Sequence, residues 1–225
     1  MKKLLTAVIG TSLLLVSMGS MAYAATQPQQ NENGEYLITT ADEFNWLSGR
    51  TANAIIMNDI DLGNYTPFMM NGSLKSDGSM KTIKLTINNS GSAALLTGTG
   101  TSITIDNICV DGTITASGNL AAGFIANTGD KNVVITNCVN KATITGTDYV
   151  GGFIGQIDGG TTTKVENCVN YGTITASVPA NGLGGIVGRM RSAMTIDHCI
   201  NKGTVSCPTN ATGKYWTGGI IGWAS

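Results

Sequence analysis

Two stretches decide the fold, Asn167-Cys168-Val169-Asn170-Tyr171-Gly172-Thr173-Ile174-Thr175 and Gly184-Gly185-Ile186-Val187-Gly188, because most of the chain is built from copies of them. The first stretch recurs at spacings of 30, 30 and 31 residues, with copies that start at Asn107, Asn137, Asn167 and His198. The second stays in step with it, in copies that start at Ala122, Gly151, Gly184 and Gly218. A fixed period of roughly 20 to 50 residues is typical of a repeat architecture.

The composition of the repeat favours strands over helices. Thr, Val, Ile and Asn recur with Gly at fixed places, which suits short strands joined by tight turns. The Leu spacing of a leucine-rich repeat is absent. A unit of this length holds about three strands of five residues, and winding such units stacks each strand on its equivalent at roughly 4.8 Å. We therefore expect an all-β fold, a parallel β-helix of about four to five coils, right-handed as parallel crossovers generally are.

Stacking of the coils places equivalent residues in columns. Two apolar ladders should point inward, one of Ile114, Ile144, Ile174 and Val205, the other of Phe124, Phe153, Ile186 and Ile220. A polar column should lie at a strand end, where side-chain amides can satisfy turn backbone groups, at Asn107, Asn137, Asn167 and His198. The repeated glycines should allow either a positive φ or close approach of neighbouring coils, at Gly152, Gly155, Gly185, Gly188, Gly219 and Gly222.

The first 24 residues are typical of a secretory signal peptide. Lys2 and Lys3 are followed by an apolar run over 4–16, and Ala22-Tyr23-Ala24 offers small residues for cleavage after Ala24. The apolar run is too short to span a bilayer in the mature protein, and no later stretch is long enough. The sequence therefore predicts a secreted or cell-surface protein without a transmembrane segment in the mature chain.

The mature chain divides into a lead-in segment over 25–79 and repeats over 80–225. We expect the lead-in to hold a flexible start, lead-in strands and a short helix, since Thr40 and Glu43 form a capping-box pattern and Phe44 and Leu47 share one face. That helix should cover the first coil. No cap follows Gly222, so we expect either a shortened relative of longer proteins or a last strand edge that pairs with another chain.

Charge and cysteine usage exclude several classes. Charged residues make up 12% of the chain and the net charge is −1, so the basic surface needed for nucleic acid is absent. Three of the five cysteines hold the same place in successive repeats and should stack as free, buried thiols: Cys138, Cys168 and Cys199. No Cys-x-x-Cys pair is present, so we expect no metal site and no cofactor.

The two repeated phrases resemble the bacterial repeats named for the GLUG motif, a Gly-Gly-apolar-apolar-Gly segment that follows Asn-Cys-x-Asn-x-Gly-Thr. The resemblance covers about residues 80–225. Such repeats occur in large exported and surface proteins, including the region ahead of the catalytic part of IgA-cleaving zinc metallopeptidases. The resemblance implies an adhesin-like role, although such a motif defines a scaffold more than an activity.

Catalytic motifs are scarce. A zinc-peptidase helix needs two histidines, and His198 is the only one, so neither that motif nor a nucleophile with a general base can be built. Glu166 and Asp197 should lie on neighbouring strands of one column that also includes Asp106 and Thr136. A β-helical carbohydrate-active enzyme, a lyase or hydrolase, that uses these two carboxylates is therefore the alternative to a non-catalytic protein.

Two further features could bind a ligand. Thr-x-Thr pairs flank the first inward ladder in every repeat and should form two outward rows, which resemble the faces of some β-helical ice-binding proteins. Aromatic residues that could stack on sugars lie in or near turns, at Tyr149, Tyr171, Tyr215 and Trp216. The function we expect is non-catalytic, adhesin-like recognition of host or cell-wall glycans or proteins, with ice binding as a third hypothesis.

Overall fold

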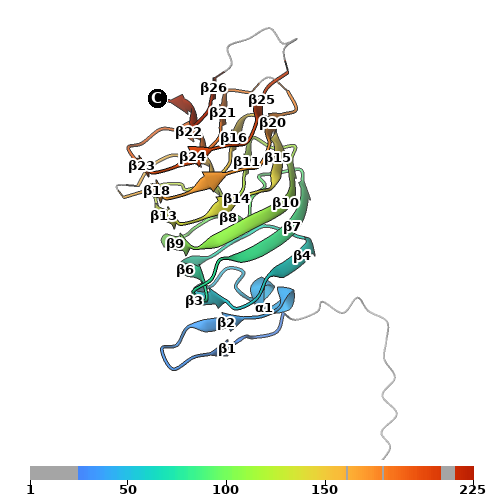
Figure 1. The fold of residues 1–225 in the computed structure, drawn as a ribbon, viewed down its shortest axis with the longest axis vertical. Coiled ribbons are helices and arrows are strands. Elements are labelled where there is room, and N and C mark those ends of the chain that lie inside the picture. The colour runs from blue at the N-terminus through green and yellow to red at the C-terminus, as the bar shows by residue number, and fades with distance from the viewer. Residues whose placement is uncertain (1–24, 161, 179, 209–215) are drawn as a thin grey trace, which may run out of the picture.

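The protein is a β-solenoid whose strands stack along its longest axis (Figure 1). The computed structural model describes residues 25–160, 162–178, 180–208 and 216–225, so the predicted signal peptide over 1–24 lies outside the described residues. Between coils, the paired strands are parallel, whereas β1 and β2 pair in the antiparallel sense. The prediction of an all-β fold with parallel coils is confirmed.

Four sheets form the faces of the solenoid. Sheet A holds eight strands in the spatial order β1 (Gln29–Gln30), β2 (Tyr36–Ile38), β3 (Thr51–Ile56), β6 (Asn71–Ser76), β9 (Ser102–Asp106), β13 (Asn132–Thr136), β18 (Lys164–Glu166) and β23 (Thr195–Asp197). Sheet B holds nine strands: β4 (Ile60–Asn64), β7 (Lys81–Asn89), β10 (Ile108–Ala116), β14 (Val139–Asn140), β15 (Thr143–Gly146), β19 (Val169–Asn170), β20 (Ile174–Ala176), β24 (Ile200–Asn201) and β25 (Val205–Ser206).

The other two sheets are smaller. Sheet C holds six strands: β5 (Phe68–Met69), β8 (Leu96–Gly98), β12 (Ile125–Asn127), β17 (Ile154–Ile157), β22 (Val187–Met190) and β27 (Ile221–Ala224). Sheet D holds four: β11 (Leu120–Ala122), β16 (Tyr149–Gly151), β21 (Gly182–Gly184) and β26 (Thr217–Gly218). Each full coil passes through the sheets in the order A, B, D and C, so residues one repeat apart become neighbours on the same sheet.

The inward ladders follow the predicted register. Ile114 pairs with Ile144, which pairs with Ile174, and all three are fully buried. In the second ladder the rings of Phe124 and Phe153 stack with centroids 4.9 Å apart and planes 4° apart. The last member of each ladder is only partly buried, at Val205 and Ile220. The core is therefore continuous, and it becomes more accessible in the coil that contains these two residues.

The corner between sheets A and B is turned by one residue with a positive φ in each repeat. These are the members of the predicted polar column, with φ of 57°, 54°, 54° and 48° at Asn107, Asn137, Asn167 and His198. Asparagine tolerates this left-handed conformation better than other non-glycine residues. His198 thus occupies a corner position that the other repeats give to Asn.

The alternative of a positive φ is wrong for all six repeated glycines, and all but Gly219 lie in close approach to a neighbouring backbone. A Cβ at Gly152 would collide with the carbonyl oxygen of Gly185 in the next coil, and one at Gly185 would collide with that of Gly219. Gly155 and Gly188 are equally crowded, by the carbonyl oxygens of Ala126 and Gly155. These glycine positions are therefore too crowded for a side chain, while the left-handed turn falls at the Asn column.

The lead-in segment is packed onto the solenoid. Helix α1 (Ala41–Trp46) has the predicted capping box between Thr40 and Glu43, and it buries Phe44 against Tyr65 and Phe68. Within the start expected to be flexible, β1 pairs with β2. Parallel stacking begins at β2 and β3, so the solenoid extends ahead of the sequence repeats that start near residue 80. Within the described ranges, no helix is long and apolar enough to cross a membrane.

Candidate functional site

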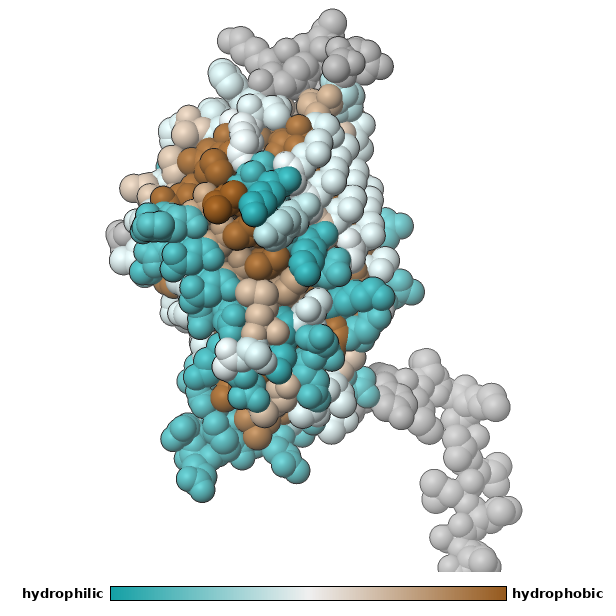
Figure 2. Space-filling model, in the orientation of Figure 1, coloured by the Kyte–Doolittle hydropathy of each residue, from teal (hydrophilic) through white to brown (hydrophobic). Residues whose placement is uncertain are grey.

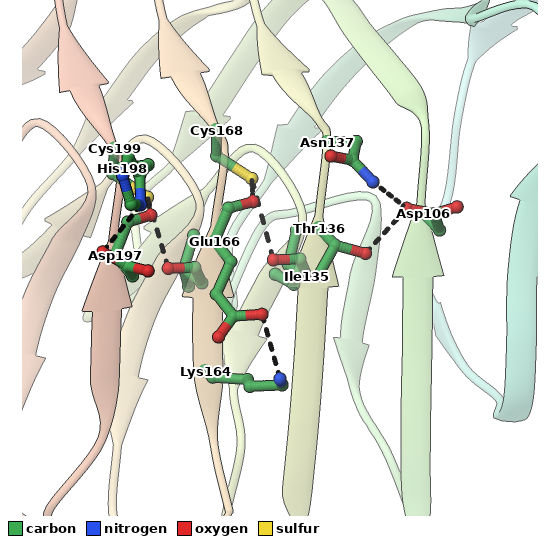
Figure 3. Close-up of polar contacts among 11 residues, drawn as sticks. Asp106, Ile135, Thr136, Asn137, Lys164, Glu166, Cys168, Asp197, His198 and Cys199 are labelled. Carbon is green, nitrogen blue, oxygen red and sulfur yellow. Dashed lines mark hydrogen bonds and ion pairs between the residues drawn. The ribbon is translucent and has the colours of Figure 1, made fainter.

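The acidic column on sheet A forms as predicted. Glu166 pairs in register with Asp197 on one side and with Thr136 on the other, and Thr136 pairs with Asp106. Figure 3 shows that each carboxylate turns to a partner of its own. Glu166 forms an ion pair with Lys164 at 2.9 Å, and Asp197 lies 2.8 Å from the Nδ1 atom of His198. The two carboxylates therefore do not share a hydrogen bond or a common substrate pocket.

Asp106 completes the column in the same way. It accepts hydrogen bonds from Thr136 Oγ1 at 2.7 Å and Asn137 Nδ2 at 2.8 Å (Figure 3). Asp197 and His198 are exposed, with 56% and 76% of their side chains accessible to solvent. Nothing in this geometry distinguishes an acid from a base, so the arrangement gives no support to the lyase or hydrolase hypothesis.

A ladder of cysteines directly follows the corner residues next to this column: Cys138, Cys168 and Cys199. The amide of Cys138 donates to Cys168 Sγ at 3.4 Å, and the Sγ of Cys168 in turn approaches the Glu166 carbonyl at 3.1 Å (Figure 3). Cys199 repeats the second contact with the Asp197 carbonyl, at 3.3 Å. All five cysteines are free. The three thiols of the ladder thus contact backbone groups at the corner, in addition to the apolar filling that the sequence suggests.

The hydrogen bond with Cys138 is the main cause that raises the pKa of the Cys168 thiol to about 12. The pKa of Cys199 is raised as well, chiefly by its hydrogen bond with Cys168 and then by burial. Thiols of this kind are protonated at neutral pH and are poor metal ligands and nucleophiles. In the part of the chain that the structure describes, no group of three or more His, Cys, Asp or Glu side chains is arranged to hold a metal ion.

Sheet B carries the predicted threonine rows. Thr113 pairs with Thr143, and a parallel row runs through Thr115, Thr145, Thr175 and Ser206. Figure 2 shows pale bands beside a hydrophobic stripe on the face that it presents. Such rows also have a purely structural explanation, because each cross-strand Thr pair stabilises a sheet by a few tenths of a kcal/mol. Ice binding therefore stays a hypothesis.

The hydrophobic stripe is an outward column of sheet B. It consists of Cys109, Val139, Val169 and Ile200, which are neighbours in register. Tyr171, 50% exposed, lies beside it with the Lys202 Nζ atom 5.3 Å from its ring centroid. A shallow groove here is lined by Met80, Thr82, Cys109, Val139, Lys141 and Tyr171. Tyr171, one of the four predicted binding residues, thus makes no ring contact with another aromatic side chain of the described residues.

A second aromatic surface spans sheets C and D, and we call it the aromatic–arginine cluster: Tyr149, Arg189, Trp216 and Trp223. The guanidinium carbon of Arg189 lies 4.1 Å from the ring centroid of Trp223 and 4.7 Å from that of Tyr149. The rings of Trp216 and Trp223 are 15° from parallel, with centroids 6.4 Å apart. Arg189 also donates a hydrogen bond from Nη1 to Tyr149 Oη at 3.0 Å. The cluster is a row of planar groups at the surface.

The strands explain how the cluster assembles. Register places Arg189 of β22 between Gln156 of β17 and Trp223 of β27, all on sheet C. Tyr149 begins β16 and Trp216 directly precedes β26, both on sheet D. The sharp glycine corner between D and C brings the outer faces of the two sheets together, because no side chains separate them there. Residues about 75 positions apart in the sequence therefore meet on one surface.

The charges around the cluster are largely paired. Burial alone would raise the pKa of Asp158, but hydrogen bonds from Gln156, Asn127 and Arg191 outweigh it and hold the pKa below its ordinary value. Asp148 accepts hydrogen bonds from the backbone and side chain of Asn181. Burial, and then the nearby charge of Asp148, raise the pKa of Tyr149, so its phenol is neutral at physiological pH.

The structure brings together two of the four predicted binding residues, Tyr149 and Trp216. Tyr171 lies on another sheet, and Tyr215 lies outside the described residues. The sequence analysis missed Arg189 and Trp223. Each directly follows the last glycine of a Gly-Gly-apolar-apolar-Gly phrase, and counting one repeat from Arg189 would have found Trp223 beside it.

No family model matches this chain, and no curated protein matches it. Among solved structures, the chain is similar to a crystal structure titled as a "putative immunoglobulin A1 protease" from Bacteroides ovatus. The two are 15% identical, with a TM-score of 0.49, over 88% of this chain and 86% of the other. A likeness at this level carries no inference about activity. The resemblance to GLUG-motif repeats stays a prediction.

Proposed function

We propose that this protein is an exported, non-catalytic recognition protein that binds glycans through the aromatic–arginine cluster. The observation that carries the proposal is the exposed stack of Trp216, Trp223 and the Arg189 guanidinium on one surface. Trp216 is 44% exposed, although tryptophan is highly buried on average. A protein ligand is the second outcome that the experiments below allow.

The chemistry of sugars fits such a row of planar groups. A pyranose ring has one face of C–H groups, which packs on an aromatic ring, and an edge of hydroxyl groups, which hydrogen-bonds to planar polar side chains. Tyr and Trp combine an apolar body with one polar atom, so they serve both needs. Arginine and aromatic residues are also the types enriched where binding energy concentrates. A rigid β-solenoid holds these groups in place without much loss of conformational entropy on binding.

The positions of the two candidate catalytic carboxylates support the non-catalytic part of the proposal. Glu166 and Asp197 lie on sheet A, away from the cluster on sheets C and D, and each has its own polar partner. We therefore expect the double variant Glu166→Gln, Asp197→Asn to bind glycans as the parent protein does. If the parent protein cleaved a polysaccharide and this double variant did not, the enzyme alternative would be established instead.

Binding is tested on a glycan array with the protein purified after export. We expect a defined set of glycans to bind, and we expect Trp216→Ala and Trp223→Ala to reduce binding at least tenfold. Tyr171→Ala is the matched control, since it removes an equally exposed aromatic ring from sheet B. Equal losses in all three variants, or none in the two tryptophan variants, would contradict the assignment to the cluster.

Export follows from the predicted signal peptide. Amino-terminal sequencing of the protein recovered outside the cell should give Ala25 as the first residue. Recovery of the uncleaved chain from the cytoplasm would contradict this part of the proposal.

A further inference from the structure

We propose that the aromatic–arginine cluster selects acidic sugars, whose carboxylate binds to Arg189 while the sugar ring stacks on Trp216. This inference rests on the proposed function and names the ligand class of the same site. It follows from the ion pairing and the hydrogen bonding of Arg189, which differ from those of Arg191, the residue directly after β22. Arg191 is only two residues away, and its Nη1 atom lies 3.0 Å from the Asp158 carboxylate.

Arg189 has no carboxylate partner among the described residues. The six ion pairs found there do not include it. The two acids of this surface are already engaged, Asp158 by Arg191, Gln156 and Asn127, and Asp148 by Asn181. A half-buried guanidinium without a counter-ion attracts an anion more strongly than one on an open surface, because solvent screens it less.

The hydrogen bonds of Arg189 also leave capacity for a ligand. Within the described chain it donates to Tyr149 Oη, and its buried Nε has no partner. The rings of Tyr149 and Trp223 fix the plane of the guanidinium, so its orientation does not depend on internal hydrogen bonds. Because its Nε is buried, the guanidinium can bind a carboxylate only through its two Nη groups, whose fork geometry matches that anion.

Tyr149 holds the guanidinium in place. Its oxygen accepts from Arg189, and its own O–H is engaged by the side chain of Asp148. Because burial raises the pKa of Tyr149, the group is a neutral phenol at pH 7 and adds no negative charge beside the guanidinium. Arg189 is therefore the cation that this surface offers to an anion, next to the exposed face of Trp216.

Calorimetric titration with matched sugars tests the inference. One pair is trigalacturonate and its methyl ester, which differ in charge but not in ring structure, and the other is sialyllactose and lactose. We expect at least one acidic member to bind at least tenfold more tightly than its neutral counterpart, with an advantage that falls as salt rises. Arg189→Gln should abolish this preference and leave residual binding of the neutral sugar. Arg189→Lys should restore only part of it, because an ammonium cannot bind the carboxylate with two parallel hydrogen bonds.

The outcomes separate this inference from the proposed function. Equal affinity for the acidic and neutral members, or a preference that survives Arg189→Gln, would overturn the selection of acidic sugars and leave glycan recognition standing. Absence of binding to these sugars and to every member of the glycan array would overturn both. Thermal unfolding of Arg189→Gln must match the parent within a few degrees, and Tyr149→Phe provides a second variant that removes the phenolic oxygen to which Arg189 donates.

Discussion

Two kinds of asparagine close each coil, and they act in different ways. Asn167 and its equivalents turn the corner between sheets A and B with a positive φ, at the surface. Asn140 and Asn170 are fully buried, and the Nδ2 atom of Asn140 donates to Asn170 Oδ1 at 2.7 Å. The strain of a left-handed non-glycine residue is about 1 kcal/mol, whereas each buried polar group left unpaired costs about 1–3 kcal/mol. The internal asparagines should therefore matter more for stability.

The substitution Asn170→Ala tests this difference. It removes the acceptor for Asn140 Nδ2 and for the Gly172 amide, so we expect the free energy of unfolding in urea to fall by about 2–4 kcal/mol. Asn181→Ala is the control, because that exposed amide pairs with Asp148 at the surface and should cost no more than about 0.5 kcal/mol. Equal costs for the two variants would mean that the internal amide ladder adds nothing.

The thiol of Cys168 should be inert while the protein is folded. Its pKa is raised to about 12, chiefly by the hydrogen bond with Cys138, so thiolate is scarce at pH 8. We expect iodoacetamide at pH 8 to leave Cys168 unmodified in the native protein and to label it in guanidinium, as read by peptide mass mapping. Rapid native labelling would contradict the buried ladder.

The raised pKa also predicts how stability changes with pH. The folded state holds the Cys168 proton more tightly than the unfolded state, so the contribution of this thiol is complete below the unfolded pKa. It is lost as the pH rises through about 12. Cys168→Ser tests this: the alkaline loss of stability should be smaller in the variant than in the parent.

At the scale of elements, the corner between sheets D and C sets the distance between coils. A Cβ at Gly185 would collide with the Gly219 carbonyl and the Asn201 amide, whereas one at Gly219 would meet nothing within 4 Å. We therefore expect Gly185→Ala to destabilise by at least about 1–3 kcal/mol, the usual cost of overpacking, and Gly219→Ala to be tolerated. Both residues occupy the same place in the repeat, so a comparable loss in both, measured by chemical denaturation, would refute close approach as the reason for these glycines.

The sequence repeat made the strands predictable, but it gave no signal for the aromatic–arginine cluster. Ile114, Ile144 and Ile174 could be placed in register because the same residue type returns at a fixed period. The column that contains Arg189 has a different residue in each coil, Asn127, Gln156, Arg189 and Trp223, so no pattern singles it out. The left-handed corner was expected at glycine, the residue with the lowest steric cost, but Asn fills it because Asn also tolerates that conformation. Binding chemistry arises here where the repeat varies.

At the scale of the whole molecule, packing changes along the solenoid axis. Helix α1 covers the first coils and buries Phe44 completely. In the coil that contains β23 to β27, residues equivalent to buried ones are only partly covered, among them Cys199, Val205 and Ile220. Each coil of a solenoid contacts only its neighbours, so stability is close to a sum of local terms. The part of the molecule that carries the cluster should therefore unfold at the lower cost.

Tryptophan fluorescence can compare the two ends, because Trp46 lies in α1 whereas Trp216 and Trp223 lie in the cluster. Ile144→Ala removes a fully buried side chain from a middle coil, at a cost of about 2–5 kcal/mol. We expect this variant to unfold in two steps. The fluorescence of the cluster is read in a Trp46→Phe background, and that of Trp46 in a Trp216→Phe, Trp223→Phe background. The cluster signal should be lost at a lower urea concentration than the Trp46 signal. Without Ile144→Ala the two signals should change together or nearly so. If the midpoints stay coincident in the variant, the coils form one cooperative unit, and weaker packing near the cluster does not allow that end to open independently.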